Sequence, residues 1–137
     1  MLETARLRLR ELTIDDAEFI VAQLNDLAFI HNVADRGVRT IAAARAYILA
    51  GPIASYRQHG FGLHLVELKD PRVPIGICGL IKRDALDDVD IGFAFLPPYR
   101  GQGFALEAAR ATMAFALRRG LSRVVAIVAL HNTDSIR

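Results

Sequence analysis

The sequence lacks several features that would place it in a class at once. Its only cysteine, Cys78, lies in an apolar strand-like run, so no disulfide can form within the chain and a reducing compartment fits best. We expect this thiol to be a small buried apolar group. Lys and Arg number 17 against 15 Asp and Glu, and the resulting net charge of +2 is too small for nucleic-acid binding through charge alone.

Long apolar runs and targeting signals are also missing. No run reaches the roughly 18 residues that are needed to span a bilayer. The first residues, Met1-Leu2-Glu3, do not form a signal-peptide pattern. These absences predict a soluble, cytoplasmic protein that has neither nucleic acid nor a membrane as its partner.

Metal-ligand spacing is absent among the four histidines, which are His31, His59, His64 and His131. We therefore expect no metal. His64 lies on an alternating segment, where a packed or paired side chain is expected. There is also no usable Cys/His or Ser/His/Asp arrangement for covalent catalysis.

The chain does contain enough apolar material for one domain. With 137 residues and 53% hydrophobic content, it can bury one sizeable core but not two. Alternating apolar and polar residues predict strands over 6–12 and 61–68. Strands are also expected over 74–83 and 89–96, and the short polar connections favour an antiparallel meander. The continuous apolar run 124–129 predicts a buried strand that pairs in parallel.

Helices are expected where cap residues precede helical periodicity. Thr13 can cap one helix, and Thr40 can cap the Ala-rich run 41–50. Gly51-Pro52 is expected to interrupt or kink this second helix, and Gly60 to close the segment.

A third helix is expected after Ala105 and should end at Gly120, which follows two arginines. Its pattern predicts an amphipathic helix, because apolar residues recur at helical spacing. These residues are Leu106, Ala109, Met113 and Leu117.

The most informative stretch, Tyr99-Arg100-Gly101-Gln102-Gly103-Phe104-Ala105, joins the strand 89–96 to this third helix. Its glycines let the backbone approach a ligand closely, and the free N–H groups at the start of the helix favour an anion. A P-loop is excluded because no Gly-Lys-Ser/Thr follows. A dinucleotide fingerprint would need a third glycine where Leu106 stands, and a preceding strand of a parallel sheet.

A third pattern, Arg/Gln-x-x-Gly-x-Gly/Ala, is matched by Arg100, Gly103 and Ala105. It resembles the coenzyme A pyrophosphate loop of the GNAT N-acetyltransferase superfamily. Flanking segments resemble one branch of it, the ribosomal-protein N-terminal acetyltransferase-like group. These segments are Leu7-Arg8-Leu9-Arg10, 40–44, 90–97, Leu106-Glu107-Ala108 and Asn132-Thr133-Asp134-Ser135.

The resemblance implies an α/β (α+β) fold, with a GNAT-like mixed sheet in a single domain over 1–137. An antiparallel meander and a parallel strand pair would surround the cofactor helix, with helices on the flanks. Acetyl-CoA would be the acyl donor, and the acetyl group would pass directly to a primary amine. The acceptor would be a protein or peptide N-terminus or a small-molecule amine.

The resemblance also implies roles for particular residues. Arg100 would add charge near the pyrophosphate, and the main chain of Phe95 and Leu96 would pair with the pantetheine arm, with one N–H polarising the thioester carbonyl. Asn132 would hydrogen-bond the same arm. The pyrophosphate would be wrapped by the backbone N–H groups of Gly101, Gln102, Gly103, Phe104 and Ala105.

Two side chains are candidates for proton transfer. Asp90 would act as the general base or would orient the amine; a solvated strand residue, an acceptor-binding role and proton loss through water are the alternatives. Ser135 would protonate the departing thiolate, with helix capping as the alternative. His31 falls in the segment 28–39, where this family usually shapes the acceptor pocket.

The resemblance fails at the end of the chain. Arg137 falls where family members normally continue through a helix and two further strands. We expect that the recorded sequence is incomplete, or that a partner chain, as in a homodimer, supplies the strands, because an open sheet edge would otherwise be exposed. The alternative is a non-catalytic acyl-CoA-binding module.

Overall fold

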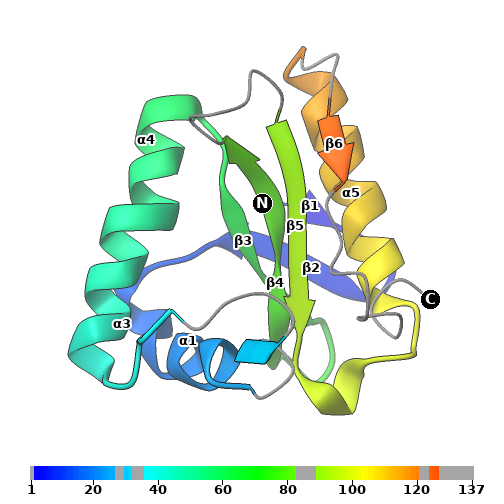
Figure 1. The fold of residues 1–137 in the computed structure, drawn as a ribbon. Helices are drawn as coiled ribbons and strands as arrows, with labels where there is room; N and C mark the ends of the chain where they lie inside the picture. The colour runs from blue at the N-terminus through cyan, green and yellow to red at the C-terminus, as the bar shows by residue number, and fades with distance from the viewer. Residues whose placement is uncertain (1, 27–29, 32–35, 83–88, 121–123, 127–137) are drawn as a thin grey trace.

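The fold is a six-stranded sheet in the order β1-β2-β3-β4-β5-β6, with helices on both faces (Figure 1). The structure is a computed structural model that describes residues 2–26, 30–31, 36–82, 89–120 and 124–126. Neighbouring strands are antiparallel from β1 to β5, and β5 pairs with β6 in parallel. The expected mixed sheet, a meander followed by a parallel pair, is confirmed.

The strands lie close to the ranges predicted from alternation, with one addition at the N-terminus. Their bounds are β1 Leu2–Glu3, β2 Leu7–Glu11, β3 Leu63–Leu68, β4 Pro74–Lys82, β5 Val89–Phe95 and β6 Val124–Ala126. The predicted extension of the last strand to residue 129 falls outside the described residues. The two-residue strand β1 was not predicted, because it is too short to show a periodic pattern.

One face of the sheet is covered by the helices α1, α3 and α4, and the other by α5 (Figure 1). The helical bounds are η1 Ile14–Asp16, α1 Ala17–Leu24, α3 Ile41–Ile48, η2 Leu49–Ile53, α4 Ala54–His59, η3 Pro97–Tyr99 and α5 Phe104–Arg118. None of the helices in these described ranges is long and apolar enough to cross a membrane.

Both threonine caps expected from the sequence are confirmed. The Thr13 hydroxyl accepts a hydrogen bond from the Asp15 N–H, and the Asp16 carboxylate reaches back to the Thr13 N–H in a capping box. The first turn after Thr13 is a 3₁₀ turn. Thr40 accepts from the Ala43 N–H at 3.0 Å. A side-chain oxygen thus satisfies an N–H group that the helix itself leaves without a partner.

Gly51-Pro52 interrupts the α-helix, as predicted, although the chain stays helical there. The chain passes through it in a π-helical turn, η2, and continues directly into α4. A wider turn can accommodate the missing proline N–H, since the hydrogen-bond ladder shifts by one residue there. Gly60 ends α4 in the left-handed conformation, with φ of +77°, as predicted.

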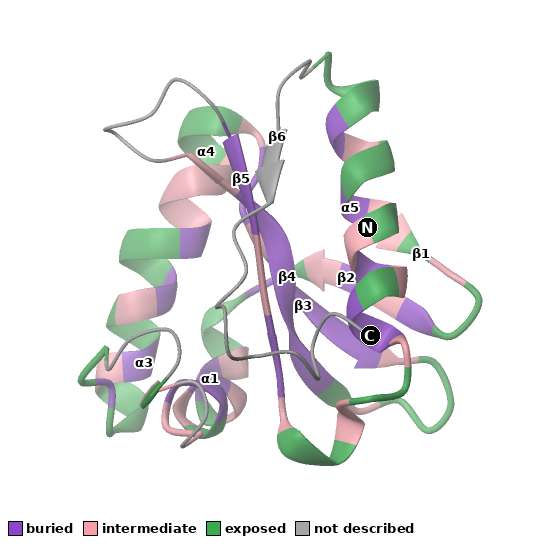
Figure 2. Ribbon diagram, turned by 45° about the vertical axis from the view of Figure 1, so that its right-hand side comes forward, coloured by how far each residue is buried: buried purple, intermediate pink, exposed green. Residues whose placement is uncertain are grey.

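The helix α5 forms where it was predicted but buries a different face. Leu106, Met113 and Leu117, which were expected on its apolar face, are 46%, 37% and 66% exposed. Figure 2 shows the exposed outer surface of α5 in green. The residues that α5 buries are mostly small: Phe104, Ala105, Ala108, Thr112 and Ala116. Small side chains let the helix lie close against the sheet, and this preference outweighs the burial of larger apolar groups.

The core is divided between the two faces of the sheet. Ile20, Leu24 and Ala94 belong to the cluster that faces α1 and α3. Phe95, Phe104 and Ala108 belong to the cluster under α5. Because strand residues alternate between faces, Asp90 is on the same side of β5 as Ala94. The end of β5 therefore meets both layers, immediately before the glycine-containing loop.

Candidate functional site

The loop between β5 and α5 has an unusual backbone. Gly101 and Gly103 have φ of +73° and +81°, in the left-handed region that side chains disfavour. A Cβ at Gly103 would lie 3.4 Å from Nη2 of Arg6, whereas Gly101 faces open space. Both positions thus favour glycine because of their left-handed backbone, and a side chain at position 103 would also contact the Arg6 guanidinium.

The N-terminus of α5 is open. Gly103 is its N-cap residue and has no side chain to cap the first turn, and no hydrogen bond from the first turn to a side chain is found among the described residues. The Gly103 carbonyl starts the helical ladder by accepting from the Glu107 N–H at 3.1 Å. The N–H groups before Glu107 therefore have no acceptor within the helix. Together with the positive end of the helix dipole, they form an arrangement suited to a phosphate group.

Arg100 starts this loop and links it to the opposite layer. Its Nη2 donates to Oδ2 of Asp26 at 2.6 Å, and its Nε donates to the Phe95 carbonyl at 3.0 Å. Its side chain is 18% exposed. The guanidinium is thus paired with a carboxylate and fixes the turn that follows β5. Its predicted role of adding charge beside a pyrophosphate stays a prediction.

The main chain at the end of β5 has one edge available. The Leu96 N–H donates to the Ile75 carbonyl at 2.9 Å, so Leu96 is bonded to β4. Hydrogen bonding alternates along an antiparallel strand, and the main-chain groups of Phe93 and Phe95 are therefore directed to the opposite edge. Within the described ranges, pairing with β6 on that edge extends only as far as Ile91.

This geometry distinguishes the two residues proposed to pair with a pantetheine arm. The Leu96 amide is already used by Ile75, whereas the Phe95 amide is directed to the edge. The Phe95 side chain is 2% exposed and belongs to the core. Because the Phe95 carbonyl accepts from Arg100, the Phe95 N–H is the main-chain group of these two residues that is placed to meet a ligand.

Asp90, the predicted base, lies near the start of β5. It is paired with Ile81 on β4 and Val125 on β6, and it is 1% exposed. A carboxylate at such depth needs polar contacts to remain charged. Its position on the face of α1 and α3 separates it from the glycine loop, which leads onto the opposite face.

Of the three other predicted site residues, the structure describes only His31. Asn132 and Ser135 lie outside the described residues. His31 is described and exposed.

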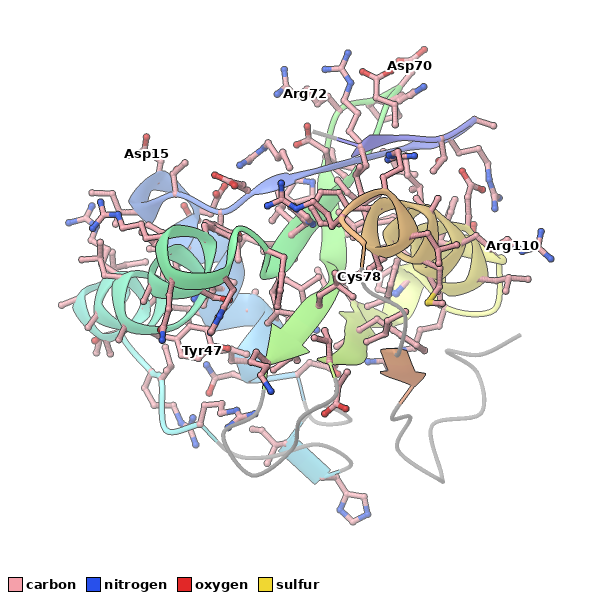
Figure 3. All side chains as sticks on the ribbon, turned by 90° about the horizontal axis from the view of Figure 1, so that it is seen from above. Asp15, Tyr47, Asp70, Arg72, Cys78 and Arg110 are labelled. Carbon is pink, nitrogen blue, oxygen red and sulfur yellow. The ribbon has the colours of Figure 1, made fainter. Side chains whose placement is uncertain are left out.

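Cys78 and His64 are buried packing residues, as expected. Burial raises the pKa of Cys78 to about 12, although a contact of its Sγ with Oγ1 of Thr112 at 3.4 Å acts in the other direction. Figure 3 shows Cys78 in the middle of the molecule. Burial, followed by the N-terminal charge, lowers the pKa of His64 to about 4. Its ring stacks on Tyr56 and meets the edge of Phe115. Neither side chain belongs to the loop.

The sequence did not indicate that the N-terminal segment contacts this loop. Arg6 donates to the Gln102 carbonyl at 3.1 Å, and its guanidinium carbon lies 4.3 Å from the centre of the Phe104 ring. Contacts between residues almost a hundred positions apart leave no local pattern. A cavity of about 480 Å³ opens beside them, lined by Glu3, Thr4, Arg6, Gly103, Leu106, Glu107, Arg110 and Ala111.

Comparisons with known proteins agree with the loop and the sheet. The family model described as acetyltransferase (GNAT) domain matches residues 6–137. A comparison with curated protein sequences finds no match.

Solved structures share the fold across most of their length. A GNAT-family acetyltransferase from Bacillus anthracis is 25% identical, with a TM-score of 0.79 over 99% of this chain and 78% of that one. A putative ribosomal-protein-serine acetyltransferase from Vibrio cholerae is 22% identical, with a TM-score of 0.76 over 98% of this chain and 77% of that one. A ribosomal L7/L12 α-N-protein acetyltransferase, solved in complex with coenzyme A, is 18% identical, with a TM-score of 0.77 over 97% of this chain and 76% of that one.

The match of a family model to nearly the whole chain carries more weight than the structural likenesses, since those under 25% identity show the fold alone. It agrees with the glycine loop at the open start of α5 and with the available edge of β5. The chain belongs to the acetyltransferase (GNAT) domain family.

Proposed function

We propose that the protein is an acetyl-CoA-dependent N-acetyltransferase acting on a primary amine, as one domain over the chain given. The acceptor is the α-amino group of a protein or peptide, or a small-molecule amine. The observation that carries the proposal is the uncapped N-terminus of α5, which opens with left-handed glycines directly after β5. The solved complexes of similar folds with coenzyme A and acetyl-CoA support this donor.

The residues present fit the phosphate groups of the donor. Backbone N–H groups from Gly101 to Ala105 would hold the pyrophosphate, because they lie at the start of a helix whose N-cap residue provides no side-chain cap. Glycine at 101 and 103 keeps the approach clear of Cβ atoms. The pantetheine arm would lie along the edge of β5 beside Phe95, and Asn132 would hydrogen-bond it.

The transfer needs no covalent enzyme intermediate. The bound donor supplies a thioester whose carbonyl carbon is attacked by a neutral amine. The Phe95 N–H is the group we assign to stabilising the developing negative charge on the carbonyl oxygen. Because Asp90 is buried five residues before Phe95 on β5, it would accept the proton of the amine through intervening water or orient the amine, and Ser135 would donate a proton to the departing thiolate. Holding both substrates in contact supplies much of the remaining rate enhancement.

Release of free thiol tests the activity. Acetyl-CoA is incubated with the protein and a panel of amines that contains peptides with different N-termini and small polyamines. Acceptor-dependent thiol release, with a mass increase of one acetyl group on the amine, is the expected result. Binding of acetyl-CoA without acceptor-dependent release would instead support the non-catalytic acyl-CoA-binding module.

Substitution of Asp90→Asn tests the proposed base. We expect kcat to fall by about 10²- to 10⁴-fold, in the range typical of a lost general base, while the affinity for CoA stays unchanged. Asp15→Asn is the matched control, because Asp15 is exposed on η1 and projects from another part of the molecule (Figure 3). An Asp90→Asn enzyme with wild-type kcat would remove Asp90 from the chemistry.

A further inference from the structure

Arg6, which was not among the residues predicted to bind there, contacts the glycine loop. Its Nη1 donates to the Gln102 carbonyl at 3.1 Å, and its guanidinium carbon lies 4.3 Å from the Phe104 ring centre. Its Nη2 is 3.4 Å from the point where a side chain on Gly103 would begin. One guanidinium thus contacts or faces three consecutive residues at the start of α5.

Glu107 holds Arg6 in this place. Its Oε1 accepts from Nε of Arg6 at 2.7 Å, and its Oε2 accepts from the Arg6 N–H at 2.9 Å and from the Thr4 hydroxyl. Burial acts to raise the pKa of Glu107, but the hydrogen bonds from Thr4 and Arg6 lower it overall. The carboxylate remains charged at neutral pH and anchors the N-terminal segment to the first turn of α5.

The two arginines near the loop are engaged differently. Arg100 is largely buried, and it bonds Asp26 and the strand end rather than the glycines. The Arg6 side chain is 47% exposed and lies beside Gly103. A guanidinium presents several N–H donors in a rigid plane, so it can bond Glu107 with one edge and Gln102 with another.

We propose that Arg6 is a positioning residue for the phosphate-binding loop. It holds Gln102, Gly103 and Phe104 in the conformation that directs their N–H groups toward a pyrophosphate, and Glu107 and Thr4 hold Arg6. This inference rests on the proposed function, since it assumes that the loop binds the pyrophosphate of CoA. Loss of Arg6 leaves the loop to be ordered by the ligand, and this ordering weakens binding.

The matched control is Arg10, on the same N-terminal segment. Arg10 also bonds a helical carboxylate, with Nη2 of Arg10 at 2.7 Å from Oδ1 of Asp16. That pair lies at the other end of β2, away from the glycine loop. Arg6→Met and Arg10→Met therefore remove similar ion pairs, of which only the first touches the loop.

The experiment is a calorimetric titration of the full chain with CoA, combined with steady-state kinetics for acetyl-CoA. We expect Arg6→Met to weaken CoA binding about tenfold and raise the KM for acetyl-CoA with kcat unchanged, and Glu107→Gln to do the same more weakly. Arg10→Met should lower the thermal unfolding temperature and leave the affinity unchanged. Arg6→Lys keeps the charge but not the planar contacts, and should restore only part of the binding.

The outcomes separate the two proposals. If the wild-type chain does not bind CoA, the proposed function is wrong. If it binds CoA and Arg6→Met binds equally well, or if Arg6→Met and Arg10→Met weaken binding alike, the role of Arg6 is overturned. Should Arg6→Met fail to fold, Glu107→Gln and Arg6→Lys decide the question, and unchanged affinity in both would overturn it.

Discussion

The two ends of α5 are built in opposite ways. At its C-terminal end the Arg119 N–H bonds the carbonyls of Phe115 and Ala116, the Gly120 N–H bonds that of Leu117, and the Arg119 guanidinium donates to the Gly60 carbonyl. At its N-terminal end, within the part of the chain that the structure describes, no side chain caps the helix. One end is completed by groups of the protein, and the other presents its N–H groups outward.

The difference shows which end of α5 is satisfied by hydrogen bonds within the protein and at which end a ligand is expected. Unsatisfied polar groups at a helix end cost free energy unless water, a side chain or a ligand meets them. The chain has the means to cap helices, because Thr13 and Thr40 do so elsewhere. The absence of such a residue before Phe104 is therefore consistent with a helix start that receives an anion.

The largest expected effect comes from closing the open end with a negative charge. Gly103→Glu places a side chain at a φ of +81°, next to the N–H groups proposed to hold the pyrophosphate. We expect CoA affinity to fall at least about 100-fold, equivalent to about 2.7 kcal/mol, in a calorimetric titration. Both steric hindrance and charge repulsion contribute.

Gly120→Glu is the control at the opposite end. Gly120 has a similar φ of +78° and open space around it. The same backbone strain should therefore lower stability by about 1 kcal/mol without changing CoA affinity. Equal losses of affinity in both variants would mean that the two ends do not differ in ligand binding.

A second prediction concerns the closed, C-terminal half of α5, where Phe115 packs on His64. The pKa of His64 is about 4 when folded and 6.5 as a free side chain, chiefly because of burial. The unfolded chain then binds more protons between these values, so stability falls as the pH drops through this range. We expect a loss of about 2 kcal/mol between pH 7 and pH 5 from this group.

Urea unfolding at the two pH values measures this loss. His64→Leu carries no titratable group and should remove that part of the pH dependence. If His64→Leu and the wild-type chain lost the same stability on acidification, the buried histidine would not be its source.

The smallest effect is expected at a capped helix start. Thr40→Ala removes the oxygen that accepts the Ala43 N–H and should lower the free energy of unfolding by about 1 kcal/mol. Thr40→Ser retains the oxygen and should keep most of the free energy of unfolding that Thr40→Ala loses. CoA affinity should not change in either variant. A loss of CoA binding in Thr40→Ala would show that the capped helix start is also coupled to the ligand.

Local patterns were sufficient to predict most of the fold. Alternation located the strands of the meander, and Thr13 and Thr40 located two helix starts. The buried face of α5 was mistaken, because the larger residues Leu106 and Leu117 lie outside while alanines pack on the sheet. Sequence periodicity shows which residues share a face, but the closeness of packing decides which face is buried.

The candidate site was predictable only where it is continuous in the chain. The glycine motif identified the loop, and its left-handed conformations follow from the residue type. The partners of the loop were not predictable, since Arg6 meets Gln102, and Asp26 meets Arg100, only through the tertiary fold. Ion pairs between such distant positions have no signature in a single sequence.

The most direct test follows backbone amide signals of the ¹⁵N-labelled protein during a titration with CoA. Gly101 and Gly103 should show large, saturable shifts, because their N–H groups belong to the loop that precedes the open end of α5. Gly60 and Gly120, at the closed end, should keep their positions. Saturable binding of CoA that leaves Gly101 and Gly103 unshifted would contradict the assignment of this loop as the pyrophosphate site.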